Sequence, residues 1–151
     1  MTKTRTSLLA TGALLALVQF VPYGRNHTNP ATRVEPAWNS PDTRELAVRA
    51  CFDCHSNETV WPWYSHVAPA SWLVQRDVER ARGELNFSEF DRPQDEADEA
   101  AEMVREGKMP LNYYLPAHRE AKLTAAEREA LAAGLAATFG DGEQHGHSDD
   151  D

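Results

Sequence analysis

The chain is 151 residues long and acidic, with 24 Asp and Glu residues against 15 Lys and Arg residues and a formal net charge of −9. Single domains usually run to about 100–150 residues, so the length leaves room for one small core with short extensions. A surface with this excess of negative charge repels phosphate backbones, which excludes nucleic acid as an expected partner.

The N-terminal segment reads as a targeting sequence. Lys3 and Arg5 precede an uncharged stretch, residues 6–24, with an apolar centre. This pattern is typical of a signal peptide or a signal anchor. No good small-x-small cleavage site follows, and the stretch is near the lower limit of the roughly 17–25 residues that span a bilayer. We expect residues 1–24 to form an uncleaved single-pass anchor whose positive end stays in the cytoplasm. A cleaved leader is the alternative.

The domain itself is expected to begin at residue 40. Residues 25–39 read as a linker, because asparagines and prolines interrupt any periodic pattern. Ser40 and Pro41 then predict the start of a helix, since the serine can cap free amides and proline fits the first helical position. This first helix is expected to run into Cys51.

The run Cys51-Phe52-Asp53-Cys54-His55 contains the only two cysteines of the chain. C-x-x-C-H is the signature of covalent c-type haem attachment. Two thiols at this spacing can form thioethers with the two vinyl groups of one porphyrin, and the imidazole that follows becomes the proximal iron ligand. A disulfide, a thioredoxin-like pair or half of a zinc site are the alternatives. A structural zinc site needs about four ligands, however, and no βαβ pattern accompanies the cysteines.

Tryptophans cluster after this motif. Trp61 and Trp63 lie in an aromatic stretch, and Trp72 lies in a second helix expected over about residues 70–85. Because a porphyrin offers a large apolar surface, we expect these three to pack on the haem, with an ordinary aromatic core as the alternative. Pro69 is expected near the proximal histidine, where a backbone carbonyl would accept the second N–H of the imidazole.

Two more helices complete the prediction. Residues 93–106 have alanines and a valine on one side and an acidic, solvated face on the other, and Gly107 supplies a stop signal. A capping box at Thr124 and Glu127 predicts a last helix that continues to Phe139. No alternating strand pattern competes with these helices. Residues 140–151 form an acidic tail with two histidines, His145 and His147, and are expected to be disordered.

The second axial ligand is expected to be Met109. It lies in the loop after Gly107 and follows His55 by 54 residues, enough chain to pass around a haem. A thioether opposite histidine raises the reduction potential and closes the iron to oxygen and peroxide. Met103 is expected in the core. His66 and His118 are the alternatives, either as ligands or as proton shuttles beside an open iron.

Several motifs follow one another along residues 40–139, and as a set they resemble the bacterial haem-binding domain family, small membrane-anchored or exported c-type haem proteins. The resemblance implies a single haem bound covalently through Cys51 and Cys54, with His55 as proximal ligand and Met109 opposite. Three positions depart from the family pattern, His66, Phe90 and Phe139. The motifs are Cys51–Asn57, Trp61–Ser65, Ala68-Pro69, Ser71–Leu73, Asp77-Val78, Leu85–Ser88, Gly107–Pro110, Tyr113, Leu115, Leu123-Thr124 and Glu127.

The sequence thus predicts an all-α, cytochrome-c-like domain around one covalent haem, preceded by a membrane anchor helix. We expect a single-electron carrier, not an enzyme, on the periplasmic side of the bacterial inner membrane. Its acidic surface favours a redox partner with a basic docking patch. A haem-based sensor or a peroxidase-like protein with an open or displaceable sixth ligand is the alternative, and a soluble periplasmic protein is the alternative location.

Overall fold

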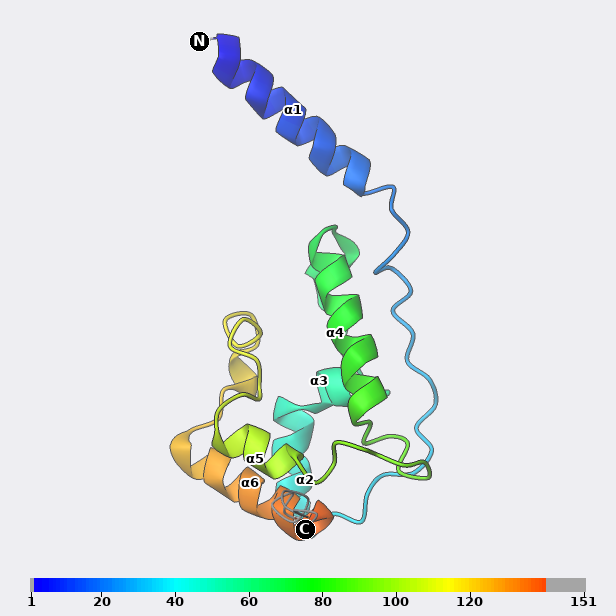
Figure 1. The fold of residues 1–151 in the computed structure, drawn as a ribbon, viewed down its shortest axis with the longest axis vertical. Helices are drawn as coiled ribbons and strands as arrows, with labels where there is room; N and C mark the ends of the chain where they lie inside the picture. Colours follow the sequence, from blue (N-terminus) through cyan, green and yellow to red (C-terminus); the bar gives the residue numbers. More distant parts are fainter. Residues whose placement is uncertain (1, 141–151) are drawn as a thin grey trace, which may run out of the picture.

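The computed structural model describes residues 2–140, and this part of the chain is helical, without extended strands (Figure 1). The predicted all-α class is confirmed for these residues. The predicted tail, with His145 and His147, lies outside them. The elements are α1 (Thr2–Val18), α2 (Pro41–Ala50), α3 (Phe52–His55), α4 (Ala70–Glu84), α5 (Ala100–Arg105) and α6 (Ala125–Phe139), with short 3-10 helices at Trp63–His66 and Arg119–Ala121.

Local capping signals set the starts of α2 and α6. The hydroxyl of Ser40 accepts a hydrogen bond from the Thr43 amide at 3.2 Å, and Pro41 is the first helical residue. At α6, the Glu127 amide donates to the Thr124 hydroxyl at 3.2 Å, and the Thr124 amide donates to the Glu127 carboxylate at 2.8 Å. Both predicted helix starts are confirmed.

The third helix is shorter than predicted, because only Ala100–Arg105 is α-helical and residues 95–99 form turns. Gln94 ties the start of this stretch to another segment: its side chain accepts from the Asn86 amide at 2.7 Å and donates to the Glu89 carbonyl at 2.8 Å. Neighbouring carboxylates also repel one another here, and Glu99 is the main cause of the raised pKa of Glu96. Both effects disfavour a regular helix before Ala100.

Gly107 ends α5 as predicted, in a left-handed conformation with φ of +68°. Its amide bonds the Val104 carbonyl at 3.1 Å, and the Lys108 amide bonds the Met103 carbonyl at 3.0 Å, which is the Schellman pattern. The Met109 amide also bonds the Met103 carbonyl at 3.0 Å. The chain therefore turns back over the end of α5 and carries Met109 with it.

The core lies where α2, α5 and α6 meet (Figure 1). Phe52 of α3 and Phe87 belong to the same buried cluster. Helices α2 and α6 approach closely at Gly134, where a Cβ atom would overlap the side chain of Thr43. The central buried side chains are Ala47, Val104, Leu131 and Leu135.

Residues 25–39, predicted to be a linker, are attached to the domain along much of their length. The amide of Arg33 bonds the Ser88 carbonyl at 2.9 Å, and the Phe90 amide bonds the Val34 carbonyl at 2.9 Å. The ring of Trp38 lies 5.2 Å from that of Phe87. Backbone pairing and one tryptophan therefore attach this segment to the domain, and neither leaves a periodic signal in the sequence.

The segment after α1 is fastened to the start of α4. The side-chain amide of Gln19 donates to the Ala68 carbonyl at 2.8 Å and accepts from the Ala68 amide at 3.0 Å. Helix α1 itself extends away from the other helices (Figure 1). No helix within residues 2–140 has both the length and the apolar character needed to cross a membrane. The anchor stays a prediction.

Two glycine replacements should affect stability in opposite directions. Gly134→Ala places a methyl group against Thr43, and such overpacking typically costs about 1–3 kcal/mol. Gly83→Ala, in α4, meets open space, and the better helix propensity should stabilise by up to about 1 kcal/mol. Chemical denaturation of the two variants beside the wild type measures both effects. Equal stability of Gly134→Ala and the wild type would contradict the close helix crossing.

Candidate functional site

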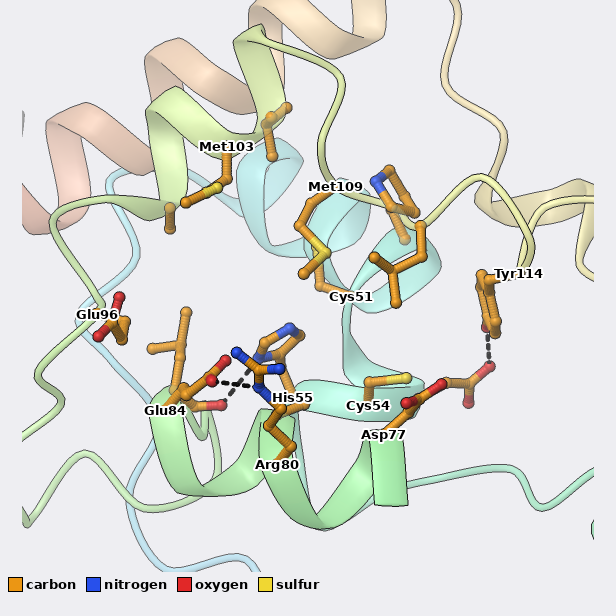
Figure 2. A pocket seen from close by; sticks show the side chains of 18 of the residues that line it. Cys51, Cys54, His55, Asp77, Arg80, Glu84, Glu96, Met103, Met109 and Tyr114 are labelled. Atoms are coloured by element: carbon orange, nitrogen blue, oxygen red, sulfur yellow. Dashed lines mark hydrogen bonds and ion pairs between the residues drawn. The ribbon is translucent and has the colours of Figure 1, made fainter. Parts of the chain in front are cut away.

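A cavity of about 340 Å³ opens between α4, α5 and the loop after α5 (Figure 2). Ligand pockets commonly have volumes of about 300–1,000 Å³. The cavity brings together four predicted site residues, Cys51, Cys54, His55 and Met109. Its apolar walls are formed by Ala50, Ala81, Leu85, Phe87, Ala100, Val104, Pro110, Leu111 and Leu135.

His55 is the last residue of α3, and a hydrogen bond fixes its imidazole. Nδ1 lies 3.0 Å from the Leu85 carbonyl oxygen, so it is the nitrogen that donates, and Nε2 is free to bind a metal. Burial lowers the pKa of His55, which favours the neutral ring that metal ligation requires. The accepting carbonyl, expected near Pro69, belongs instead to Leu85. Helix α3 packs against the C-terminal end of α4, where the last carbonyls have no helical partner.

Both cysteines are free thiols on the cavity wall. Burial raises the pKa of Cys51 and of Cys54 to about 12. Redox-active pairs of the thioredoxin type instead have lowered thiol pKa values. Within residues 2–140, no group of three or more His, Cys, Asp or Glu side chains is placed to hold a metal ion.

Met109 reaches the cavity through the turn at Gly107. Figure 2 shows its thioether on the opposite side of the cavity from the imidazole of His55. Met103, which was predicted to be a core residue, lines the same cavity from α5. The spacing of Ala100, Met103 and Val104 places all three on one helical face, and this signal could have identified Met103.

The three tryptophans predicted to pack on the haem do not line this cavity. Trp63 is 79% exposed. Trp61 stacks on His27 with ring centroids 4.6 Å apart. The indole N–H of Trp72 is buried without a hydrogen-bond partner among the described residues. The aromatic side chains that line the cavity are instead Phe87, Tyr113 and Tyr114. Phe87 and Tyr113 belong to the motifs that resemble the haem-binding domain family, but neither is predicted to be a site residue.

The two histidine alternatives also lie outside the cavity. His66 is exposed, and its ring meets that of His27 edge to face at 4.4 Å. His118 is buried, with Nε2 2.6 Å from the Tyr64 hydroxyl and its ring stacked 3.8 Å from Tyr114. It lines a second cavity of about 210 Å³, which shares Cys54 with the first.

Charged groups surround the mouth of the first cavity. Arg80 pairs with Glu84 at 2.7 Å, and Arg76 pairs with Asp77 at 2.9 Å. Asp53, between the cysteines, accepts from the Tyr114 hydroxyl at 2.7 Å, and burial together with this bond raises the pKa of Tyr114. The tyrosine thus holds the cysteine motif against the loop that carries Met109 (Figure 2).

This is a helical protein able to hold a porphyrin, because its apolar cavity contains two thiols, an oriented imidazole and a facing thioether. A family model described as a haem-binding domain matches residues 13–137. The chain belongs to this haem-binding domain family. Neither the search of curated proteins nor the search of solved structures gave a match.

Proposed function

We propose that this protein is a c-type single-electron carrier. Cys51 and Cys54 would hold one haem covalently, and His55 and Met109 would be its axial ligands. One observation carries the proposal: a single cavity contains both thiols, with the oriented imidazole and the thioether on opposite sides (Figure 2). Membership of the haem-binding domain family supports the cofactor.

The residues of the cavity fit this cofactor. The apolar walls suit the faces of a porphyrin, and the guanidinium groups of Arg76 and Arg80 are cations near its mouth that can pair with the carboxylates of a haem. The Leu85 carbonyl orients the imidazole of His55 and increases its basicity. When bound, a haem supplies reversible one-electron chemistry, whose potential the axial ligands and burial determine.

The geometry favours the carrier over the sensor or the peroxidase. The two histidines expected as proton shuttles, His66 and His118, do not line the cavity, whereas two methionines do. A thioether ligand suits electron transfer, because it closes the iron and raises the potential.

We further propose that the haem domain lies on the periplasmic side of the inner membrane, tethered by the N-terminal segment. Lys3, Arg5 and the uncharged residues 6–24 support this location. An acidic domain in that position would exchange electrons with partners that carry a basic patch.

Electron exchange with small inorganic reagents tests the proposal. With a net charge of −9, reduction by the cation hexaammineruthenium(II) should slow as salt is added, by about tenfold between low and high ionic strength. Oxidation by the anion hexacyanoferrate(III) should become faster under the same change. Stopped-flow absorption measures both rates. Failure to exchange electrons with either reagent would contradict the carrier, and salt-independent rates would contradict the role of surface charge.

A further inference from the structure

Residues 59–75 contain no Asp, Glu, Lys or Arg, although 26% of the whole chain is charged. This segment includes the 3-10 helix Trp63–His66 and the first turns of α4. The other long uncharged segment of the chain is residues 6–24. The tryptophans of this segment are expected at the haem, but Trp63 faces solvent and Trp61 stacks on His27.

Four apolar side chains of this segment face solvent: Val60, Trp63, Val67 and Leu73, which we call the loop face. Val60 is 74% exposed and Trp63 is 79% exposed. Val60 and Leu73 also both line the second cavity. Clustered apolar side chains on a surface mark a site of interaction, since each would lose unfavourable contact with water on binding.

The backbone holds the loop face in place. The amide of Val60 bonds the Asp53 carboxylate at 3.0 Å, and the Ser65 hydroxyl bonds the Pro62 carbonyl at 2.6 Å. The Val67 amide bonds the Tyr64 carbonyl at 3.1 Å. Trp63 is thus presented to solvent by a loop with fixed hydrogen bonds, and it meets Tyr64 only edge to face, with ring centroids 5.9 Å apart.

The loop face lies beside the end of the other uncharged segment. Gln19 makes two hydrogen bonds to the backbone of Ala68, which follows Val67 directly. Phe20 is 83% exposed, next to this junction. Figure 1 shows that α1 leaves the domain at the end where α4 begins. An exposed apolar surface of the domain therefore continues into the apolar N-terminal segment.

We propose that the loop face docks into the interfacial region of a lipid bilayer, beside the point where residues 6–24 enter it. This inference rests on the proposed membrane tether. Tryptophan is enriched at membrane interfaces, where its apolar ring and its N–H are both accommodated. The acidic remainder of the domain is repelled by anionic headgroups, so an uncharged face is the one that can approach them. A basic redox partner would find no carboxylate on this segment.

Site-directed spin labelling of the full-length, haem-loaded protein tests the proposal. Covalent haem attachment, as proposed, would consume both native cysteines in thioether bonds. A nitroxide can then be attached at Trp63→Cys, or at Val60→Cys in a protein that keeps Trp63. Glu129→Cys, on an exposed position of α6 far from α1 in Figure 1, is the matched control. Each variant is placed in phosphatidylcholine vesicles. Flotation reports attachment, and collision rates with oxygen and with a water-soluble nickel chelate report depth.

We expect all three variants to float with the vesicles. The reference for each variant is the same protein without vesicles. On transfer to vesicles, the collision rate with the nickel chelate should fall several-fold at positions 60 and 63, while the rate with oxygen rises. At position 129 neither rate should change. If the protein floats but positions 60 and 63 stay as accessible to nickel as position 129, docking is overturned, the tether stands, and the loop face is left for a protein partner. If the protein does not float, tether and docking fail together.

Discussion

Replacing Met109 by alanine is expected to leave the haem attached but to open the iron. The thiols and the imidazole that would hold the cofactor are untouched, whereas the thioether facing His55 is lost. Axial ligands set haem potentials over a range of about 0.8 V, so we expect the reduction potential to fall by roughly 0.1–0.3 V. The reduced variant should also bind carbon monoxide, which the wild type should not. Potentiometric titration and absorption spectra measure both changes.

Met103→Ala is the matched control, because Met103 is the second methionine that lines the cavity. It should lose packing and some stability but retain the potential and the closed iron of the wild type. The reverse result, an open iron in Met103→Ala and a closed one in Met109→Ala, would assign the sixth ligand to Met103. An unchanged spectrum in both variants would show that neither methionine is an iron ligand.

Replacing His55 by alanine should have the largest effect on the cofactor. Losing a residue that only orients a metal ligand already costs about 10–100-fold in metal affinity, and losing the ligand itself should cost more. On this basis we expect the yield of haem-loaded protein to fall by at least about tenfold. Any haem that is retained should lack the low-spin spectrum. The ratio of haem absorbance to protein measures the loading.

His118→Ala provides the comparison for the histidine. His118 is buried and bonds Tyr64, so its loss should lower stability while haem loading and ligation persist. A His55→Ala protein with normal loading and a normal spectrum would refute the proximal assignment. Loss of ligation in His118→Ala alone would indicate instead that His118, which lines the second cavity, binds the iron.

The parts of the fold that follow from neighbouring residues could be predicted from the sequence. Ser40, Thr124 and Gly107 fix helix ends through hydrogen bonds to residues within five positions, and such patterns are visible in one dimension. The early start predicted for the third helix is wrong, because contacts with another segment decide where this helix begins. Gln94 bonds Asn86 and Glu89, and a periodic pattern contains no sign of such contacts.

Parts of the site depended on packing that a sequence pattern does not contain. The spacing of Cys51, Cys54 and His55 places three groups together, but the carbonyl that orients the imidazole is set by how α3 meets the end of α4. The size of the tryptophans predicts that they pack on the haem. In the structure, Phe87 lines the cavity and Trp63 is exposed on the surface. Composition indicates that a large apolar surface is present without saying where it is.

The most direct test of the central claim is a set of absorption spectra of the exported protein, made in cells able to attach haem c. The spectra are recorded oxidised, reduced, and reduced under carbon monoxide. We predict low-spin spectra, a weak charge-transfer band in the far red when oxidised, and no response to carbon monoxide, as expected for iron between histidine and methionine. A high-spin spectrum that shifts with carbon monoxide would show an open iron and contradict the electron carrier, and a colourless protein would contradict the haem site itself.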